Sequence, residues 1–282
     1  MTAPIRHLAL DAEERARDRQ RRFLVVARIA LPATIGVFTL GLWELLVWAH
    51  QIPPYILPAP SRIAVSLVED WSTLSDSLLV TLQITAMALT LAVAGGVALA
   101  VLFTQSKIVE LSLFPYAVVL QVTPIIAISP LILIYVDSTW VALLICAWIV
   151  AFFPILSNTT LGLNSADHNL ADLFQLYGAS RWQTLVHLRL PTALPYFLGG
   201  LRIAGGLSLI GAVVAEFAAG TAGSGTGLAF RILEAGYRLN IPRMFAALLL
   251  ISATGIAIFL LTSLVAHLAL RRWHESAMRR ER

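Results

Sequence analysis

The sequence predicts an all-α membrane protein with six transmembrane helices. Of its 282 residues, 58% are hydrophobic and only 13% are charged. Soluble domains carry about 25% charged residues. Apolar runs recur along the chain, and about 20 apolar residues are what a helix needs to cross the hydrocarbon core of a bilayer. Helices are favoured because they satisfy their own backbone hydrogen bonds in lipid.

The expected spans cover residues 28–49, 78–104, 112–136, 139–157, 193–217 and 244–268. The first span carries Glu44 near one end, where a carboxylate can reach water. Prolines between residues 52 and 60 then impose an extended path. Ser61 follows them, and we expect it to cap a short surface helix that runs through Val68.

The second and fourth spans, 78–104 and 139–157, are regular apolar runs, but the third span is interrupted. Pro115, Pro124 and Pro130 lie within 112–136. Each removes a backbone donor, so we expect a kink or a break there. The fourth span holds Cys146, the single cysteine, which excludes a disulfide within the chain or a thiolate cluster.

The fifth span, 193–217, is rich in small residues: Gly199, Gly200, Ala204, Gly205, Gly206, Ser208, Gly211, Ala212 and Ala215. Small faces let membrane helices approach closely. Two interpretations stay open, namely tight packing within one bundle and a moving interface beside a transport path. A glycine-rich segment, 218–243, with a short helical pattern from Leu228 to Tyr237, leads into the sixth span, 244–268.

The loop at residues 158–192 carries the most informative pattern of the chain. Leu170, Leu173, Phe174 and Tyr177 recur at helical spacing and predict one apolar face of a short helix. Gly178 should end this helix in the left-handed conformation. A second short apolar segment follows, with Trp182, Leu185 and Val186, and we expect Pro191 to end it.

Such a pair of helices between two spans is typical of a docking site for a partner protein. The alternative is a helix that lies on the inner leaflet. The lack of a Lys/Arg-rich polar face disfavours it.

The distribution of arginine along the chain predicts the orientation of the spans in the membrane. Residues 1–28 hold seven arginines and residues 269–282 hold five. With an even number of spans, the positive-inside rule places both termini in the cytoplasm. The expected organisation is a cytoplasmic tail over 1–27, a transmembrane domain over 28–268 with a cytoplasmic loop at 158–192, and a cytoplasmic tail over 269–282.

Several function classes are excluded or disfavoured. No Walker motif is present, so an ATP-driven process needs a separate subunit. The six histidines lack metalloprotease spacing. Ser224 is a poor candidate for the nucleophile of an intramembrane serine protease, because Ala222 stands two residues before it where a glycine is expected and because the serine is expected in an aqueous loop. The net charge of +4 is no nucleic-acid signal. Glu44 and Glu216 are open to two interpretations, structural or functional, because intramembrane carboxylates are costly and often functional.

A series of short motifs runs through the chain: Leu57-Pro58-Ala59-Pro60-Ser61, Thr123-Pro124, Ser129-Pro130-Leu131, Asp172, Gly178-Ala179-Ser180-Arg181, Leu190-Pro191, Leu194-Pro195, Gly200-Leu201-Arg202, Val213-Val214-Ala215-Glu216-Phe217 and Gly225-Thr226-Gly227-Leu228. Those from Asp172 to Phe217 resemble the "EAA" signature, with its following segments, of type I ABC importer permeases. The resemblance is closest to the nitrate, sulfonate, taurine and bicarbonate class, and it covers the chain from about Leu42 to Leu268.

Two departures are visible in the signature. Asp172 stands where the family has Glu, and Leu173-Phe174 replace two alanines. The acid and the glycine keep their spacing, so a docking helix is still expected. Its bulkier exposed residues imply a matching pocket in the ATPase.

The resemblance implies a methionine-importer-like permease fold and transport by alternating access. It implies a second copy of the permease, two ABC ATPase subunits that bind ATP and Mg²⁺, and a periplasmic binding protein that delivers a small solute such as a sulfonate, taurine or nitrate. No cofactor or metal is expected in this chain. Membrane lipid surrounds it, and the location is the bacterial inner membrane.

The resemblance also implies residue roles. The loop 164–190 would bind the ATPase through Leu170, Asp172, Leu173, Phe174, Tyr177, Gly178, Ala179 and Arg181. Candidates for the translocation pathway are Thr123, Ser129, Gly205, Gly206, Ser208 and Glu216. The alternatives are an ion-coupled secondary transporter, which would need more mid-membrane ionisable residues, a membrane enzyme, and a non-transporting scaffold.

Overall fold

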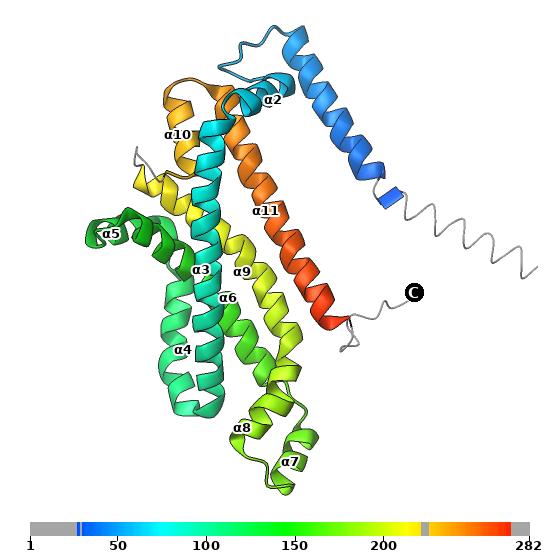
Figure 1. Cartoon of the computed structure of the whole chain (residues 1–282), viewed down its shortest axis with the longest axis vertical. Helices are drawn as coiled ribbons and strands as arrows, with labels where there is room; N and C mark the ends of the chain where they lie inside the picture. Colours follow the sequence, from blue (N-terminus) through cyan, green and yellow to red (C-terminus); the bar gives the residue numbers. More distant parts are fainter. Residues whose placement is uncertain (1–26, 29, 221–225, 272–282) are drawn as a thin grey trace, which may run out of the picture. The chain divides into compact units, whose positions relative to one another are not determined.

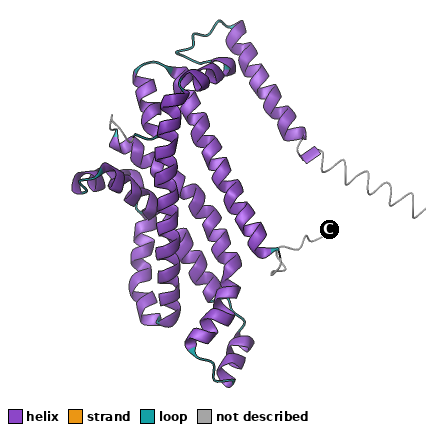
Figure 2. Cartoon of the chain, in the orientation of Figure 1, coloured by secondary structure: helices purple, strands orange, loops and turns teal. Residues whose placement is uncertain are grey.

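The computed structural model describes residues 27–28, 30–220 and 226–271, and this part of the chain is helical with short loops (Figures 1 and 2). It forms two compact units, Met1–Val65 and Ser66–Arg282. Among the described residues, five helices are long and apolar enough to cross a membrane: Ala30–Ala49, α3 (Trp71–Gln105), α6 (Thr139–Leu163), the helix Arg181–Ala219 that contains α9 (Leu190–Ala219), and α11 (Ile241–Leu270).

In the first unit, Glu44 belongs to the helix Ala30–Ala49. Its carboxylate accepts hydrogen bonds from the backbone N–H of Ser61 at 3.0 Å and from the Ser61 hydroxyl at 2.7 Å. The expectation that Ser61 caps the next helix is wrong, because α2 (Pro60–Glu69) already begins at Pro60. Proline suits a first helical position, where its missing N–H has no partner to lose.

The expected third span is a broken pair. α4 (Lys107–Val122) and α5 (Ile125–Tyr135) are bent by 101° at the intervening residues. The break falls at Thr123-Pro124, and both residues have extended backbone angles. The residue before a proline avoids helical angles, which explains the position of the break. Pro115 and Pro130 lie inside α4 and α5 without ending them. Counted as one span, the pair makes six.

The core of the second unit lies around α6, which packs against α3 and α9. Two glycines of α9 allow the closest approach. A Cβ at Gly211 would lie 2.8 Å from the Cα of Ala147, and a Cβ at Gly200 would lie 2.8 Å from the carbonyl oxygen of Pro154. Real side chains do not fit at these distances, so tight packing explains these two residues.

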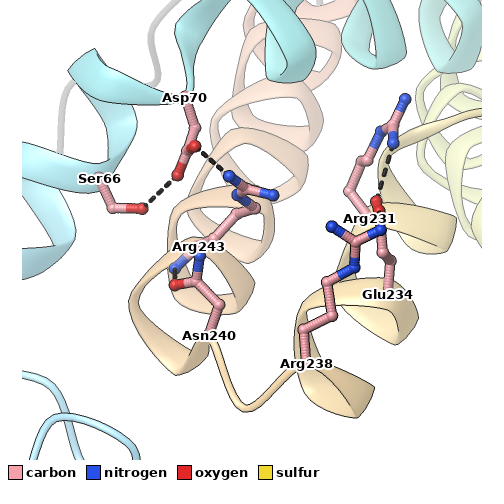
Figure 3. A network of polar contacts seen from close by, with 7 residues as sticks. All are labelled: Ser66, Asp70, Arg231, Glu234, Arg238, Asn240 and Arg243. Atoms are coloured by element: carbon pink, nitrogen blue, oxygen red, sulfur yellow. Dashed lines mark hydrogen bonds and ion pairs between the residues drawn. The ribbon is translucent and has the colours of Figure 1, made fainter.

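Polar side chains join the start of α3 to the start of α11 at one end of the second unit (Figure 3). Asp70, which precedes α3, forms an ion pair with Arg243 and accepts a hydrogen bond from the Ser66 hydroxyl at 2.8 Å. Asn240 caps α11 by accepting the backbone N–H of Arg243 at 3.3 Å. The half-buried ion pair therefore ties together helices that are far apart in the sequence.

The adjacent helix α10 (Leu228–Tyr237) is held by its own charged residues. Arg231 donates to the Ser77 hydroxyl of α3 at 2.8 Å and pairs with Glu234 at 2.8 Å. Arg238 pairs with the other oxygen of Glu234 at 3.0 Å (Figure 3). The hydrogen bond from Arg231 lowers the pKa of Glu234. These contacts fix α10 against α3.

The Asp70–Arg243 pair predicts a pH-dependent stability. The hydrogen bond from Arg243 lowers the pKa of Asp70 below its ordinary value. A carboxyl with a depressed folded-state pKa stabilises the protein at neutral pH, and this contribution is lost as the pH falls through that pKa. We expect Asp70→Asn to lower the unfolding temperature in detergent at pH 7. The difference from the wild type should shrink below about pH 4.

Asp76→Asn is the matched control, because Asp76 is an exposed acid on α3. It should change the unfolding temperature little at either pH. An Asp70→Asn effect that is equally large at pH 3.5 and pH 7 would contradict the role given to the ion pair.

Candidate functional site

The loop between α6 and α9 contains α7 (His168–Leu176) and α8 (Arg181–Thr184). The carboxylate of Asp167 accepts the backbone N–H of Asn169 at 2.7 Å and caps α7. Gly178 ends α7 with a φ of 68°, and the N–H of Ala179 reaches back to the carbonyl of Phe174 at 2.9 Å. The prediction of a short helix that glycine terminates is confirmed.

The predicted apolar face of α7 lies largely in the open. None of the nine residues of α7 is buried. Leu170, Leu173 and Tyr177 are exposed, and Phe174 is half-buried. Isolated helices this short are marginal in water, and exposed apolar faces of this kind mark interaction sites. The apolar side of α7 is therefore a candidate interaction surface.

A groove of about 520 Å³ adjoins this face. Its lining consists of five predicted residues, Leu173, Phe174, Tyr177, Gly178 and Ala179, together with Gln183 and His187. Sequence reasoning missed Gln183 and His187. The signal for Gln183 was present, because Ser180 and Gln183 form a capping box: each side chain accepts the other residue's backbone N–H, at 3.2 and 2.7 Å.

The expectation that Pro191 ends the second loop helix is wrong. α8 continues through a π-helical turn, Leu185–Arg189, directly into α9. Within that turn the N–H of Leu190 donates to the carbonyl of Leu185, five residues earlier. A proline lacks an N–H and crowds the carbonyl four residues before it. The wider turn relieves this crowding, so the helix passes the proline without a break.

Asp172 is exposed in the middle of α7, and Arg181 is exposed at the start of α8. The loop thus brings all the predicted ATPase-binding residues into one short segment. Ala179 and Arg181 also line a separate polar pocket of about 350 Å³ that reaches the end of α3.

The six predicted pathway residues do not form one cluster. Thr123 lies at the break between α4 and α5, and Ser129 is buried in α5. Gly205 packs against Ile258 and Thr262 of α11. Gly206 faces open space, since a Cβ there would meet no atom within 4 Å.

Ser208 is buried in α9, where it donates to the carbonyl of Gly205 at 2.9 Å. The small residues of α9 thus serve different purposes on different faces of the helix.

Glu216 is 2% exposed, at the far end of α9. Its carboxylate accepts hydrogen bonds from the Thr81 hydroxyl at 2.8 Å and from the backbone N–H of Ala229 at 2.9 Å. The Thr81 oxygen in turn accepts the N–H of Leu228 at 2.9 Å. A Cβ at Gly227 would overlap the carboxylate. Glu216 therefore joins α9 to α3 and occupies the N-terminus of α10, where a negative charge is favourable.

The other charged residue in the middle of α9 is Arg202, whose guanidinium lies 5.6 Å from the ring centre of Phe259 on α11. A cation over an aromatic face is attracted by the ring.

Within the described residues, no group of three or more His, Cys, Asp or Glu side chains could hold a metal ion.

Comparison with known proteins identifies relatives over most of the chain. The family described as "Binding-protein-dependent transport system inner membrane component" matches residues 78–275. The formylaminopyrimidine transport permease protein ThiX of Halalkalibacterium halodurans is 32% identical over 232 residues, which cover 80% of this chain and 88% of ThiX. The riboflavin transport system permease protein RibX of Chloroflexus aurantiacus is 30% identical over 255 residues, 88% of this chain and 91% of RibX.

The fold also has a counterpart among solved structures. A chain in the crystal structure of an amino acid ABC transporter with histidines superposes with a TM-score of 0.60 and 21% identity, over 74% of this chain and 97% of that chain. The chain belongs to the binding-protein-dependent transport system inner membrane component family, and it is the permease subunit of an ABC importer whose ATPase is a separate subunit.

Proposed function

We propose that two copies of this permease form the translocation pathway for a small anion, and that each copy binds one of two ATPase subunits through residues 164–190. The observation that carries the proposal is the unburied apolar face of α7, closed by Gly178. Relatives named as a putative aliphatic sulfonates permease and as nitrate import permeases support an organic or inorganic anion as the solute.

In this proposal the apolar side chains of α7 enter a pocket of the ATPase. Leu170, Leu173, Phe174 and Tyr177 supply the buried contact, and the groove beside them receives a side chain of the partner. Asp172 and Arg181 form the polar rim of the contact, and Gly178-Ala179 set the angle between the two helices. ATP and Mg²⁺ bind to the ATPase and not to this chain.

The continuous helix Arg181–Ala219 supports a direct mechanical link from this contact into the membrane. Movement of α8 shifts α9, because no loop separates them. Packed helices move as rigid elements between discrete arrangements. ATP binding and the loaded periplasmic binding protein then bias an equilibrium between inward-facing and outward-facing forms.

The pathway itself is proposed to run along the open face of α9, with Gly206 on it and Thr123 and Ser129 at the bend between α4 and α5. Gly205 and Ser208 contribute through helix packing, and Glu216 contributes by holding α10 in place. Selectivity for the solute resides mainly in the binding protein.

The membrane arrangement of the proposal places both termini in the cytoplasm of a bacterial cell, with the chain in the inner membrane. The tails are 1–27 and 269–282, the transmembrane domain is 28–268, and the loop 158–192 faces the ATPase. The arginines of both tails support this orientation.

Docking through α7 predicts that Leu173→Asp weakens ATPase binding at least tenfold, because an unpaired charge in an apolar contact is costly. Gly178→Val should have a similar effect, because a β-branched residue is strained at a φ of 68°. The measurement is the affinity of the purified permease for its ATPase, together with ATP-dependent uptake in proteoliposomes.

Tyr237→Asp is the control, since Tyr237 is an exposed apolar residue of α10, away from the loop. It should leave ATPase affinity unchanged. Unaltered affinity in Leu173→Asp and Gly178→Val, with both proteins folded, would refute the docking assignment.

The proposed homodimer predicts a periodic cross-linking pattern along α9. Ile203 and Ile210 are exposed on the face of Gly199 and Gly206, whereas Leu198 and Leu209 are buried. In a Cys146→Ser background, Ile203→Cys and Ile210→Cys should give a covalent dimer on oxidation. Leu198→Cys and Leu209→Cys should not. Copurification with a different permease, or equal bands at all four positions, would argue against the homodimer.

A further inference from the structure

The polar pocket beside the docking loop has an unbalanced positive charge. It lies between the C-terminal end of α3 and the loop helices, and its lining is Thr104, Gln105, Ala171, Gln175, Ala179, Arg181, Thr184 and Arg189. Two of these residues are arginines and none is acidic. Within the described part of the chain, neither guanidinium forms an ion pair. Arg189 donates only to the backbone carbonyl of Thr104, at a long 3.4 Å.

Such a pocket suits a phosphate group. Guanidinium groups match phosphate oxygens with paired N–H donors and are weakly hydrated, so they bind phosphate better than an ammonium does. The side-chain amides of Gln105 and Gln175 supply further donors on the pocket wall. An anion here would neutralise the repulsion between the two arginines.

An apolar groove follows along α3 and the helix Arg181–Ala219, both of which also line the polar pocket. Its volume is about 500 Å³, and its lining is Val93, Ala94, Val97 and Ala98 of α3, Thr159 of α6, and Leu190, Ala193, Leu194 and Phe197 of α9. Leu190 directly follows Arg189 in the chain. On α3, Thr104 lies six positions after Ala98, a distance of about 9 Å along the helix.

The basic pocket and the apolar groove together match the two parts of a lipid, a charged headgroup and an apolar acyl chain. The spacing along α3 is similar to the depth of a lipid headgroup layer, about 5–8 Å on each side of the hydrocarbon core. Ala94 and Ala98 are exposed, so the groove is open to the surroundings of α3. A soluble anion would fill only the pocket. An apolar surface of a second permease copy would fill only the groove.

We propose that an anionic phospholipid occupies this site, with its phosphate between Arg181 and Arg189 and one acyl chain in the groove between α3 and α9. Basic pockets between membrane helices at the cytoplasmic surface are known to bind anionic headgroups. The inference rests on the proposed function for the leaflet and for the role in coupling: the docking loop faces the cytoplasm, so the lipid belongs to the inner leaflet, and α7 binds the ATPase.

The position of the site gives the lipid a role in coupling. Ala171 and Gln175 of α7 line the same pocket as the end of α3. A phosphate bound there would connect the docking helix to a membrane span through charge-assisted hydrogen bonds. The lipid would hold α7 in the orientation that the ATPase binds.

The test uses the full-length chain in an uncharged detergent, without ATPase. Phosphatidylglycerol and phosphatidylcholine with identical acyl chains are added, and bound lipid is counted by native mass spectrometry. We expect phosphatidylglycerol to bind at least tenfold more tightly and to raise the unfolding temperature. Arg189→Gln should lower its affinity at least fivefold. Arg238→Gln, the same change at an exposed arginine of α10, should not.

A groove variant separates a lipid from a free anion. Ala98→Phe places a bulky side chain into the groove from an exposed position and should weaken phosphatidylglycerol binding. Inorganic phosphate at equal concentration should protect neither the wild type nor this variant against heat. Equal binding of the two lipids, equal effects of Arg189→Gln and Arg238→Gln, or full protection by inorganic phosphate would each overturn the proposal.

One further outcome would overturn the proposal, and one replacement variant keeps the test decisive. If Ala98→Phe abolishes dimerisation and leaves lipid binding intact, the groove is an interface between copies and the proposal fails. If Arg189→Gln unfolds the protein, Arg189→Lys replaces it and should retain part of the lipid affinity. Since no ATPase is present, loss of lipid binding does not bear on docking, and failure of docking does not bear on this site.

Discussion

A single continuous helix, Arg181–Ala219, determines how the rest of the structure is arranged. Its 39 residues begin in the docking loop and end at Ala219, and Glu216 near that end accepts the N–H of Ala229 in α10. Backbone groups in lipid must be satisfied within the segment, so an uninterrupted helix is the simplest stable path across the membrane. The π-helical turn at Leu185–Arg189 makes this possible despite Pro191. Gly200 and Gly211 then let the helix lie directly against α6.

The two ends of this helix have opposite character. At one end, α7 has no buried residue and offers its apolar side chains to a partner. At the other end, Glu216 is fully engaged with Thr81 and Ala229 and fixes α10. The proposed coupling requires a rigid helix between the exposed apolar face of α7 and the hydrogen bonds that Glu216 forms with Thr81 and Ala229. In the proposed mechanism, the contact at α7 is the input, and the hydrogen bonds of Glu216 to Thr81 and Ala229 connect the other end of the helix to α3 and α10.

Local patterns of the sequence were sufficient for the first helix of the docking loop and for an interruption of the third span. Spacing of Leu170, Leu173 and Tyr177 predicted α7, and Gly178 predicted its end, because both depend on residues close in the chain. The break at Pro124 was likewise local, but nothing local distinguished it from Pro115 and Pro130, which lie inside α4 and α5. Pro191 was misjudged because the sequence pattern does not show that a π turn can accommodate a proline.

Long-range contacts were beyond reach of the sequence alone. Glu216 and Thr81 are separated by 135 positions. The residues next to Glu216 in the sequence therefore could not predict that its carboxylate is buried or that Thr81 is its partner. Ser61 was predicted as a cap because of its type, whereas its actual partner is Glu44. The two faces of α9 were also indistinguishable, since Gly205 and Gly206 differ only in what packs against them.

Two exposed tyrosines allow the proposed contact between α7 and the ATPase to be measured directly. Tyr177 next to α7 is 83% exposed and Tyr237 on α10 is 87% exposed. A photoreactive phenylalanine analogue at each position, in the assembled transporter under ultraviolet light, reports which subunit lies within contact distance. We expect a covalent adduct with the ATPase from position 177 and none from position 237. An adduct from position 237, or none from position 177 in an active transporter, would contradict the proposed contact.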